Sequence, residues 1–518
     1  MKTDAVLLLG PDPSAAGPAL RCRAYADFHT RLRGLDGRAA TLVEGPADPV
    51  AALAELHRLA TVVAAGDPPT AVTELRYVPS RAARTRVADD RDGDGAWPRS
   101  VVSRQRKVIR RSTGAIFRFP VASGDLADVS GTTIEVFITD WSPCPAACAV
   151  AVHPAHPLSD GLPAGRDAAF TGRFCRHPLT GDLLPVWTAA WVRPDFGTGA
   201  VLVNPAHDGM DLAFAREAGL PVRFALAPAD HGDDPGSWQV PPVVRTGVAV
   251  RTGATDGLPF DQARAAYFER LAGHGLAEAH VDVSVGAFPI AVAAGYGRPV
   301  RWDTRRRTLA GGDPDGGEVT ALPVRALPPL AVLDPEIRAR LAVVVAPSTS
   351  AETDLLATRL LLAEFPPQPA APEVVLVGTV AGTVDDADPD ALALTLLVGA
   401  SAHETVPVKP QALESSQRFL DNHATVLGTP PGGGTSGGPA PDGPAPDGPA
   451  AARKVKAMLL AGDTKNAFTH LYRLQKALAK APSGDPAALA RYQALAHVLA
   501  GVLAKQDHGV LVEAWQQM

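Results

Sequence analysis

Two cysteines and two histidines lie in one short segment and could bind a metal ion. Thiolate and imidazole ligands spaced like Cys144, Cys148, His153 and His156 suit zinc. A helix followed by a strand is predicted for the same segment, however, and this would carry the four side chains in different directions. We therefore predict no metal site, and no other cofactor is indicated.

The sequence lacks well-placed copies of several well-known catalytic and nucleotide-binding motifs. GxSxG, HExxH, GxxxxGK[ST] and GxGxxG do not occur in a suitable context, so serine hydrolase, zincin, P-loop and dinucleotide-binding functions have no support. Two acids, Asp208 and Asp211, stand at the start of the predicted helix DLAFAREAG. The simplest function of acids in this position is to cap the helix.

The composition indicates a multidomain protein. The chain has 518 residues, of which 46% are hydrophobic, a net charge of -6 and only four cysteines. These cysteines are too few for a disulfide framework, and the charge does not indicate a nucleic-acid-binding surface over the whole chain. Apolar runs are too short for a membrane span or a signal peptide, so we expect a cytoplasmic protein with no membrane partner.

The elements that would position the site residues alternate between strands and helices. The opening AVLLLGPDPS is predicted as a buried strand, and residues 24–35 as a helix. A charged loop at residues 86–99 precedes a separate α/β domain. Its predicted strands are TTIEVFITD, LLPVWTAAWV, GAVLVNPA, PVRFALAP and HVDVSVGAFPI, with the helices DLAFAREAG and FDQARAAYFERLAGHG among them.

The second part of the chain has the pattern of a parallel sheet. The buried runs LAVVVAPS and EVVLVGTV are separated by the helical DLLATRLLLAEF, which predicts a second Rossmann-like half. Residues 429–450 repeat the unit PAPDG and are predicted to be a flexible linker. Two amphipathic helices follow, the second capped by Asp485 and Pro486; their apolar stripes are Phe468, Leu471, Leu474 and Leu478, and Leu489, Tyr492, Leu495, Leu499 and Val502.

A long segment then identifies a resemblance. FTGRFCRHPLTGDLLPVWTAAWVRPDFGTGAVLVNPAHDGMDLAFAREAGLPV, residues 170–222, resembles the core of the editing domain of leucyl-tRNA synthetases, which are class I synthetases. SRQRKVIRRSTGAIFRFPV at residues 103–121 is similar to the entry into that insertion, and FPIAVAAGYGRPVRW is similar to the return. ALALTLLVGASAHETVPVKPQALESSQRFLDNHATVL at residues 391–427 resembles the stem-contact region and first anticodon-domain helix, so the resemblance covers most of the chain.

The chain departs from the family at the two motifs that form aminoacyl-adenylate. The HIGH-type motif, whose imidazoles bind ATP phosphates, is replaced by PSAAGPALRCRAYADF, which lacks histidine. The KMSKS-type loop is replaced by EVVLVGTVAGTVDDADP, which has acids and neither lysine nor arginine. The family's zinc-knuckle cysteines and elbow-gripping C-terminal domain are not found either. We predict a degenerate paralogue, a pseudoenzyme for aminoacylation.

The resemblance implies an editing chemistry for the PAHD motif. Editing hydrolyses a wrongly attached amino acid from the 3′ end of tRNA by positioning substrate and water, without a strong nucleophile. By resemblance, Asp211 anchors the α-ammonium of the substrate, and Asp208 and His207 belong to the same binding motif. Asn204 stands where the family prefers an apolar pocket residue. Helix capping by Asp208 or Asp211 is the alternative.

The opposite wall is strongly altered. The family's TTRPDT segment corresponds to Ile138–Pro143 here, and Thr139 alone is retained in place. The arginine has become Asp140, Ser142 remains as a polar neighbour, and the discriminating threonine falls at Pro143. We predict catalytic roles for Thr139 and Asp211, with substrate contacts from Asp208, Asn204, Ser142 and His207.

The C-terminal region has the charge expected of a tRNA-binding surface. Residues 451–518 carry six Lys and three Arg against three Asp and one Glu, and the family uses the equivalent bundle against the anticodon stem. A solvated polar face is the alternative explanation. The predicted tRNA contacts lie on or beside one helix and are Lys454, Lys456, Lys465, Arg473, Lys476 and Lys480.

These observations predict an α/β fold: a Rossmann-like class I core split by a β-rich editing-like insertion and followed by a helical anticodon-binding-like bundle. The function that we expect is hydrolysis or binding of aminoacyl-tRNA or a related aminoacyl ester, without synthetase activity. The alternative is a non-catalytic paralogue that binds tRNA or a partner protein; no DNA partner is indicated. The predicted domains are the core halves at residues 1–114 and 286–408, the insertion at 115–285, the linker at 429–450 and the bundle at 409–428 and 451–518.

Overall fold

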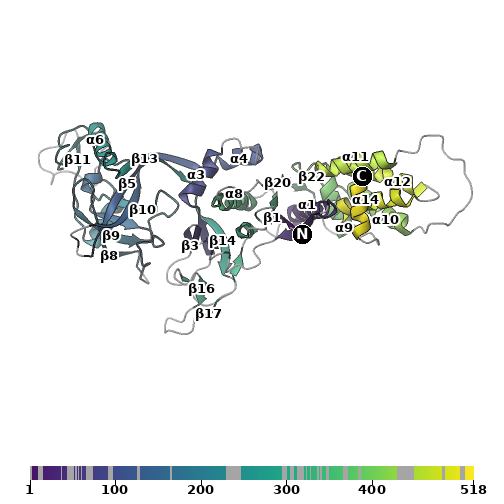
Figure 1. The fold of residues 1–518 in the computed structure, drawn as a ribbon, viewed down its shortest axis with the longest axis horizontal. Helices are drawn as coiled ribbons and strands as arrows, with labels where there is room; N and C mark the ends of the chain where they lie inside the picture. The colour runs from purple at the N-terminus through teal and green to yellow at the C-terminus, as the bar shows by residue number, and fades with distance from the viewer. Residues whose placement is uncertain are drawn as a thin grey trace, which may run out of the picture. The chain divides into compact units, whose positions relative to one another are not determined.

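The computed structural model contains the elements drawn in Figure 1. The residues that it describes are 3–9, 16–36, 38–43, 52, 55–56, 58–59, 61–65, 74–90, 97–124, 126, 129–163, 166–228, 247–293, 300–303, 308–311, 320–321, 324–326, 328–334, 338, 341–345, 349–365, 372–382, 387–428, 448–480, 485–501 and 508–518. Within these ranges, no helix has the length and apolar character needed to cross a membrane.

The chain forms two compact units. The first, which we call the terminal unit, comprises Met1–Ala52, Asp92–Arg99 and Ala326–Met518. The second, the insertion unit, comprises Leu53–Arg91 and Ser100–Arg325. The insertion unit thus extends beyond the predicted residues 115–285 on both sides. These units are compact parts of the fold, and the predicted domain boundaries stay a prediction.

A parallel sheet is the centre of the terminal unit. Its strand order is β2 (Ala39–Val43), β1 (Thr3–Leu9), β19 (Leu341–Val345) and β20 (Glu373–Leu376). β1 pairs with β19 in parallel, with Ala5 opposite Leu341, so strands from both ends of the sequence share one sheet. The helices α1 (Ala16–Leu35) and α8 (Thr349–Ala363) contact these strands, which explains why both apolar runs are continuous.

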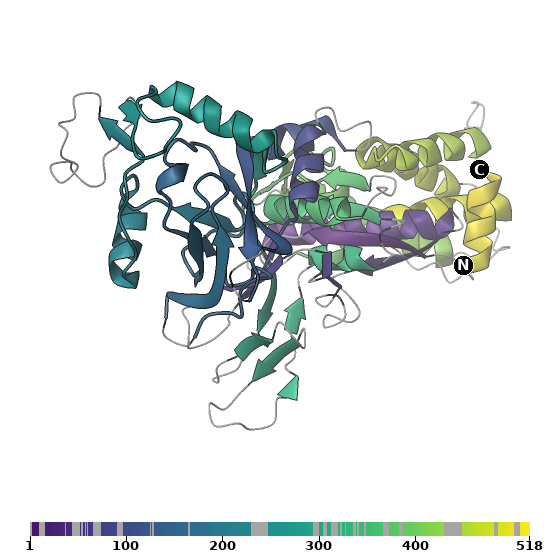
Figure 2. The ribbon, with the colours of Figure 1, turned by 60° about the vertical axis from the view of Figure 1, so that its left-hand side comes forward.

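Several helices pack together at the C-terminal end of the terminal unit. They are α9 (Pro389–Val398), α10 (Pro410–Gly428), α11 (Gly448–Leu460), α12 (Thr464–Lys480), α13 (Pro486–Ala500) and α14 (His508–Gln517). The purple helix α1 lies against this yellow-green group in Figure 2 and contacts α9, α13 and α14. The bundle is therefore part of the same compact unit as the sheet.

The prediction of two amphipathic helices after the linker was incomplete. Helices α12 and α13 occur as predicted, and Asp485 caps α13 by accepting a hydrogen bond from Ala487 N at 2.9 Å. The sequence analysis missed α11, which begins at Gly448 inside the predicted linker. Ala452, Val455 and Leu459 form its buried face at the spacing that a helix requires. Residues 429–447 of the predicted linker lie outside the described residues.

A large antiparallel-rich sheet is the centre of the insertion unit. Its strand order is β10 (Ala200–Val203), β7 (Ala149–Val152), β9 (Leu183–Ala189), β8 (Ala168–Arg176), β5 (Arg110–Ala122) and β13 (Ala277–Ser284), with β6 (Val129–Ile138) also paired to β5. Alternate residues of these strands face one apolar core, as the period of a strand requires. The core includes Phe117, Phe119, Ile134, Val136, Val150 and Val186.

The helices α5 (Gly209–Ala218) and α6 (Phe260–Ala272) belong to the insertion unit, as does the small strand pair β11 (Leu226–Pro228) and β12 (Gly247–Ala249). The predicted strand HVDVSVGAFPI is in fact two strands, β13 and β14 (Phe288–Ala293), in different sheets. Gly286 between them has φ of +84°, a conformation that ends a regular strand and that glycine adopts easily.

Shorter elements complete the description. A sheet of β18 (Val324–Ala326), β14, β4 (Glu74–Val78) and β3 (Thr61–Ala65) brings together the segments before and after the large sheet. The remaining elements are α3 (Arg81–Asp89), α4 (Arg99–Gln105), η2 (Cys144–Ala146), β15 (Val300–Asp303), β16 (Thr308–Gly311), β17 (Thr320–Ala321), η4 (Pro328–Leu333), β21 (Val380–Ala381) and β22 (Val406–Pro407).

Candidate functional site

The turn between β10 and α5 holds four of the predicted site residues. The strand ends at Val203, and the helix begins at Gly209 with Asp208 as its N-cap. The Asp208 carboxylate accepts hydrogen bonds from Met210 N at 2.8 Å and Asp211 N at 3.0 Å. This acid therefore stabilises the helix start, which is the alternative that the sequence had left open for it.

Asp211 is placed differently from Asp208, because its carboxylate turns back toward the strand. Its Oδ2 accepts a hydrogen bond from the backbone N–H of Asn204 at 2.7 Å. Among the described residues, Oδ1 accepts none. Burial raises the pKa of Asp211 to about 6, the Asn204 N–H lowers it and the nearby Asp208 charge raises it. The ionised carboxylate is thus held in a half-buried position with one oxygen left for a ligand.

Asn204 adds a second open acceptor at the same turn. Its Nδ2 donates to the carbonyl oxygen of Leu202 at 3.4 Å, whereas its buried Oδ1 has no hydrogen-bond partner in the described part of the chain. A buried amide oxygen without a donor is costly, and such atoms occur where a ligand supplies the donor. From the sequence we predicted a substrate contact by Asn204, which replaces an apolar residue of the family; the oxygen without a partner is a finding of the structure.

His207 is a neutral imidazole in this corner. Its Nε2 accepts a hydrogen bond from Ala225 N at 3.2 Å, and its ring contacts that of Phe224. Burial lowers the pKa of His207 to about 4, and the Asp140 charge raises it. Because Nε2 is an acceptor, Nδ1 carries the proton and can donate.

Cys148 lies behind Asp211, a placement that the sequence did not indicate. Its backbone N–H donates to Val203 O at 3.0 Å. Burial, and then the charge of Asp211, raises the pKa of Cys148 to about 12. The thiol therefore stays protonated and forms a nonreactive wall for the carboxylate.

The opposite wall is largely closed by its own hydrogen bonds. Asp140 Oδ1 accepts from Ser142 N at 3.2 Å and from Ser142 Oγ at 2.8 Å, and Ser142 is fully buried. The predicted substrate contact by Ser142 is therefore not supported by its position. Thr139 is exposed, and its backbone oxygen accepts from Arg264 at 3.4 Å.

Within the described ranges, no hydrogen bond links Thr139 to Asp211. The segment of Thr139 affects the β10–α5 turn through the Asp140 charge, which raises the pKa of His207. The structure thus brings Asn204, His207, Asp208 and Asp211 together at one turn. Thr139 and Ser142 belong to a neighbouring segment whose polar groups face elsewhere or remain in solvent.

A buried arginine supports the loop that precedes β10. Arg84 on α3 donates to the carbonyl oxygens of Asp195 at 2.7 Å and Gly197 at 3.1 Å. Its guanidinium lies 3.8 Å from the Asp282 carboxylate, which also accepts from Gly197 N at 2.9 Å. At Gly197, φ is +59° and a Cβ atom would lie 2.8 Å from Phe137, so glycine is required there.

The cysteines and histidines whose spacing resembles a zinc site make other contacts. Cys144 Sγ lies 3.7 Å from His177 Nε2, and the imidazoles of His153 and His156 accept hydrogen bonds from backbone N–H groups two residues on. No group of three or more possible metal ligands occurs among the described residues.

The predicted tRNA contacts lie on two helices, not one. Lys454 and Lys456 are on α11, and the other four are on α12. Lys456 is engaged within the bundle, because its Nζ donates to Trp515 O at 2.6 Å and lies 4.9 Å from the Trp515 ring centre. The exposed members are Lys454, Lys465, Arg473 and Lys476, and the side chain of Lys480 lies outside the description.

Two exposed cations, one on each helix, lie near the same histidine. Burial lowers the pKa of His470 on α12, and the charges of Lys454 and Arg473 lower it further. Lys454 of α11 and Arg473 of α12 are therefore near each other, which a single-helix pattern in the sequence could not reveal.

Comparison with known proteins matches the region that contains the β10–α5 turn. Residues 164–272 match the family model described as the editing domain of leucyl-tRNA synthetase. The matched region contains β8–β10, α5 and α6, so this part of the insertion unit is similar to the editing domain of leucyl-tRNA synthetases.

The chain is also similar in sequence to individual leucine–tRNA ligases. It is 32% identical over 233 residues to the leucine–tRNA ligase of Syntrophobacter fumaroxidans, covering 39% of this chain and 27% of the relative. The leucine–tRNA ligase of Acinetobacter baumannii is 31% identical over 244 residues, covering 41% and 28%. The chain is thus a relative of leucyl-tRNA synthetases through its editing region, and the match spans little more than a quarter of those ligases.

A solved structure was also matched. It is a ternary complex of the leucyl-tRNA synthetase of Agrobacterium radiobacter K84 with tRNA and LeuAMS, with a TM-score of 0.45 and 16% identity, covering 100% of this chain and 85% of that chain.

Proposed function

We propose that the β10–α5 turn binds the α-ammonium group of an aminoacyl ester, and that the chain hydrolyses aminoacyl-tRNA or a related ester without forming an adenylate. The observation that carries this proposal is the pair of open acceptors, Asp211 Oδ1 and Asn204 Oδ1. An ammonium group has three N–H donors and no acceptor, so it complements two oxygens at one turn.

The remaining groups suit positioning more than nucleophilic attack. Cys148 is protonated, and His207 is neutral with a donor at Nδ1. In the proposed reaction a water molecule attacks the ester carbonyl carbon, the C–O bond to the ribose oxygen breaks and a proton of the water passes to that oxygen, so that the free amino acid and the ribose hydroxyl are released. Asp211 holds the amino acid in place, and the Nδ1–H of His207 is a donor for a polar group of the bound ester.

Deacylation of a panel of charged tRNAs tests the proposal. Asp211→Ala should lower kcat/KM by about 10- to 150-fold, because a hydrogen bond to a charged group contributes roughly 1.5–3 kcal/mol. Glu217→Ala is the matched control, since Glu217 is an exposed acid on the same helix. Equal activity of the Asp211 variant and the control would locate the site elsewhere.

A non-catalytic function is favoured by a different observation. Ser142 is buried and bonded to Asp140, so the wall that confers discrimination in the family offers few polar groups here. In that case the chain binds an aminoacyl ligand, tRNA or a partner protein without turnover. A non-hydrolysable aminoacyl-adenosine amide should then bind with an affinity that Asp211→Ala lowers, while no charged tRNA is deacylated.

We also infer that the exposed cations of α11 and α12 contact the tRNA backbone, and that the chain acts in the cytoplasm. The position of Lys454 and Arg473, both near His470, supports the first inference. Phosphate groups attract such cations whatever the base sequence. The missing HIGH-type and KMSKS-type residues support the absence of aminoacylation.

A further inference from the structure

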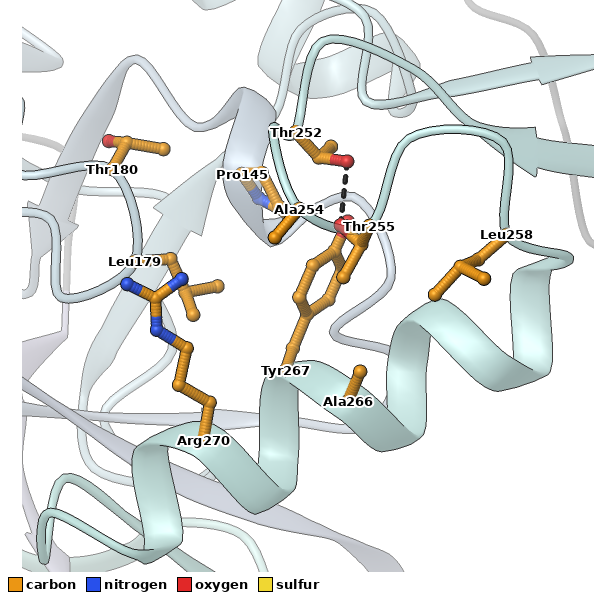
Figure 3. Close-up of a pocket in the computed structure, with 10 residues that line it drawn as sticks. All are labelled: Pro145, Leu179, Thr180, Thr252, Ala254, Thr255, Leu258, Ala266, Tyr267 and Arg270. Carbon is orange, nitrogen blue, oxygen red and sulfur yellow. Dashed lines mark hydrogen bonds between the residues drawn. The ribbon is translucent and has the colours of Figure 1, made fainter.

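A cavity in the insertion unit has no part in the proposed ammonium site. It has a volume of about 250 Å³ and lies between η2, the turn after β8, the loop before α6 and α6 itself. Its lining consists of Pro145, Leu179, Thr180, Thr252, Ala254, Thr255, Leu258, Ala266, Tyr267 and Arg270, and Asp211, Asn204 and His207 are not among these residues. Figure 3 shows Tyr267 and Arg270 projecting from the same face of α6.

One end of the cavity contains a chain of hydroxyl groups. Thr255 Oγ1 donates to the Tyr267 phenol oxygen at 3.1 Å, and Thr252 Oγ1 lies 2.7 Å from Thr255 Oγ1. Because the Thr255 hydroxyl donates, the phenol proton of Tyr267 remains for another acceptor. Tyr267 is only 4% exposed, so this donor lies deep in the cavity, and a ligand oxygen can accept its proton.

The other end carries a positive charge. Arg270 is exposed, and in the described part of the chain its guanidinium has neither an ion pair nor a hydrogen-bond acceptor. Figure 3 shows it beside Leu179. Among the described residues, none that lines the cavity is an acid. The nearby Asp256 already accepts from Thr252 N at 2.6 Å and Thr252 Oγ1 at 2.9 Å, so it is engaged with the loop.

The walls between these ends are apolar. Pro145, Leu179, Leu258 and Ala266 offer carbon atoms to a ligand. Ala266 precedes Tyr267 on α6 and lies one turn from Arg270, so its small side chain leaves the space between them open. The volume is below the roughly 300–1,000 Å³ of sites for drug-sized ligands, which favours a small molecule.

We propose that this cavity binds a small aliphatic 2-oxo carboxylate. Its carboxylate would pair with Arg270, its oxo oxygen would accept the Tyr267 proton and its aliphatic part would lie against the leucines and Ala266. The lining residues that the structure describes offer no acid to an ammonium group, so the corresponding amino acid binds more weakly. This site is separate from the proposed hydrolysis of aminoacyl esters, and each can fail without the other.

Calorimetric titration of the full chain with 4-methyl-2-oxopentanoate tests the proposal. Saturable binding is expected, with an affinity at least tenfold higher than for leucine or inorganic phosphate. Arg270→Gln should weaken binding by about tenfold or more, as expected for loss of a charge-assisted contact. Arg173→Gln, at an exposed position on β8, and Asp211→Ala should leave the affinity unchanged.

Two further variants keep the test independent of folding defects. Tyr267→Phe retains the ring and should weaken the 2-oxo acid while leaving 4-methylpentanoate, which has no oxo group, unaffected. Ala266→Leu fills the cavity and should abolish binding, with circular dichroism confirming the fold. Absence of saturable binding up to about 10 mM, equal affinity for leucine or phosphate, or equal effects of the Arg270 and Arg173 variants would overturn the proposal.

Discussion

Replacing Asp211 by asparagine should stabilise the insertion unit at neutral pH while removing its affinity for ammonium. The substitution keeps an oxygen that can accept the Asn204 N–H bond, and it deletes the charge. A half-buried carboxylate that anchors a ligand destabilises the folded domain, whereas a carboxylate that only capped a helix would stabilise it. The pH dependence of the variant therefore separates these two functions of Asp211.

The magnitude follows from the raised pKa. The ordinary value of 3.8 increases to about 6, mainly because of burial. A tenfold change in the protonation equilibrium corresponds to about 1.4 kcal/mol, so the ionised form is disfavoured in the folded domain by about 3 kcal/mol. Since the folded-state pKa is the higher one, the native chain loses this stability as the pH rises from about 4 to above 6. The variant does not, so its advantage should be about 3 kcal/mol larger at pH 8 than at pH 4.

Hydrogen exchange is the appropriate measurement, because a chain with two compact units need not unfold in one step. Peptides that cover β10 and α5 would be followed by mass spectrometry in urea, for the native chain and Asp211→Asn at each pH. Glu217→Gln is the control, and its difference from the native chain should not vary with pH. If the difference in stability between Asp211→Asn and the native chain is also constant from pH 4 to 8, the claim that the ionised Asp211 destabilises the folded domain is refuted.

Three other results are expected. Purified protein should show no leucine-dependent exchange of pyrophosphate with ATP, because the phosphate-binding motifs are missing; robust exchange would contradict this. Arg84→Met should lower the unfolding free energy of the insertion unit by about 3–5 kcal/mol in urea titrations, because it leaves a buried carboxylate unpaired. Arg81→Met is the control: it removes a partly exposed ion pair and should lower the unfolding free energy by less than about 1 kcal/mol. Reversing Lys454 and Arg473 together to glutamate should weaken tRNA binding and reduce the salt slope by roughly two, and an unchanged slope would assign these residues to a merely solvated face.

Point substitutions in the bundle are better tests than deleting residues 451–518. The Tyr25 hydroxyl lies 3.5 Å from Thr464 Oγ1, and the Arg31 guanidinium donates to Val498 O at 3.1 Å. Deletion would thus expose the apolar face of α1 and destabilise the sheet beside it. Loss of tRNA binding after deletion could then reflect unfolding, and the double charge reversal avoids that ambiguity.

Local patterns predicted many elements and one detail of the site. The alternation in TTIEVFITD and the continuous apolar run LAVVVAPS correspond to strands, and the acids before DLAFAREAG correspond to a helix start. Asp208 could be predicted as a cap, because capping depends on neighbouring backbone N–H groups two and three residues away. By contrast, α11 was missed because its charged and alanine-rich sequence has few large apolar residues.

The properties of each site side chain depend on how the chain folds around it. Burial raises the pKa of Asp211 against the opposing effect of the Asn204 N–H, which the turn brings to the carboxylate. The closure of the Thr139 wall depends on the bond between Ser142 and Asp140. The resemblance could suggest that an acid anchors an ammonium group. It could not show that Asp211, and not Asp208, has an oxygen left for a ligand.

The sequence by itself determined the likeness to the editing region, the lack of histidine and of lysine or arginine in the two segments compared with the adenylate-forming motifs, and many of the strand and helix segments, because these depend on residue identity and short-range periodicity. The tertiary structure decided the rest. It paired residues 3–9 with 341–345 in one sheet, brought together cations of two helices and enclosed a cavity between segments from residue 145 to residue 270. The physical reason is that burial, hydrogen-bond partners and local electrostatic potential arise from all the atoms around a group, and folding brings those atoms together from distant parts of the chain.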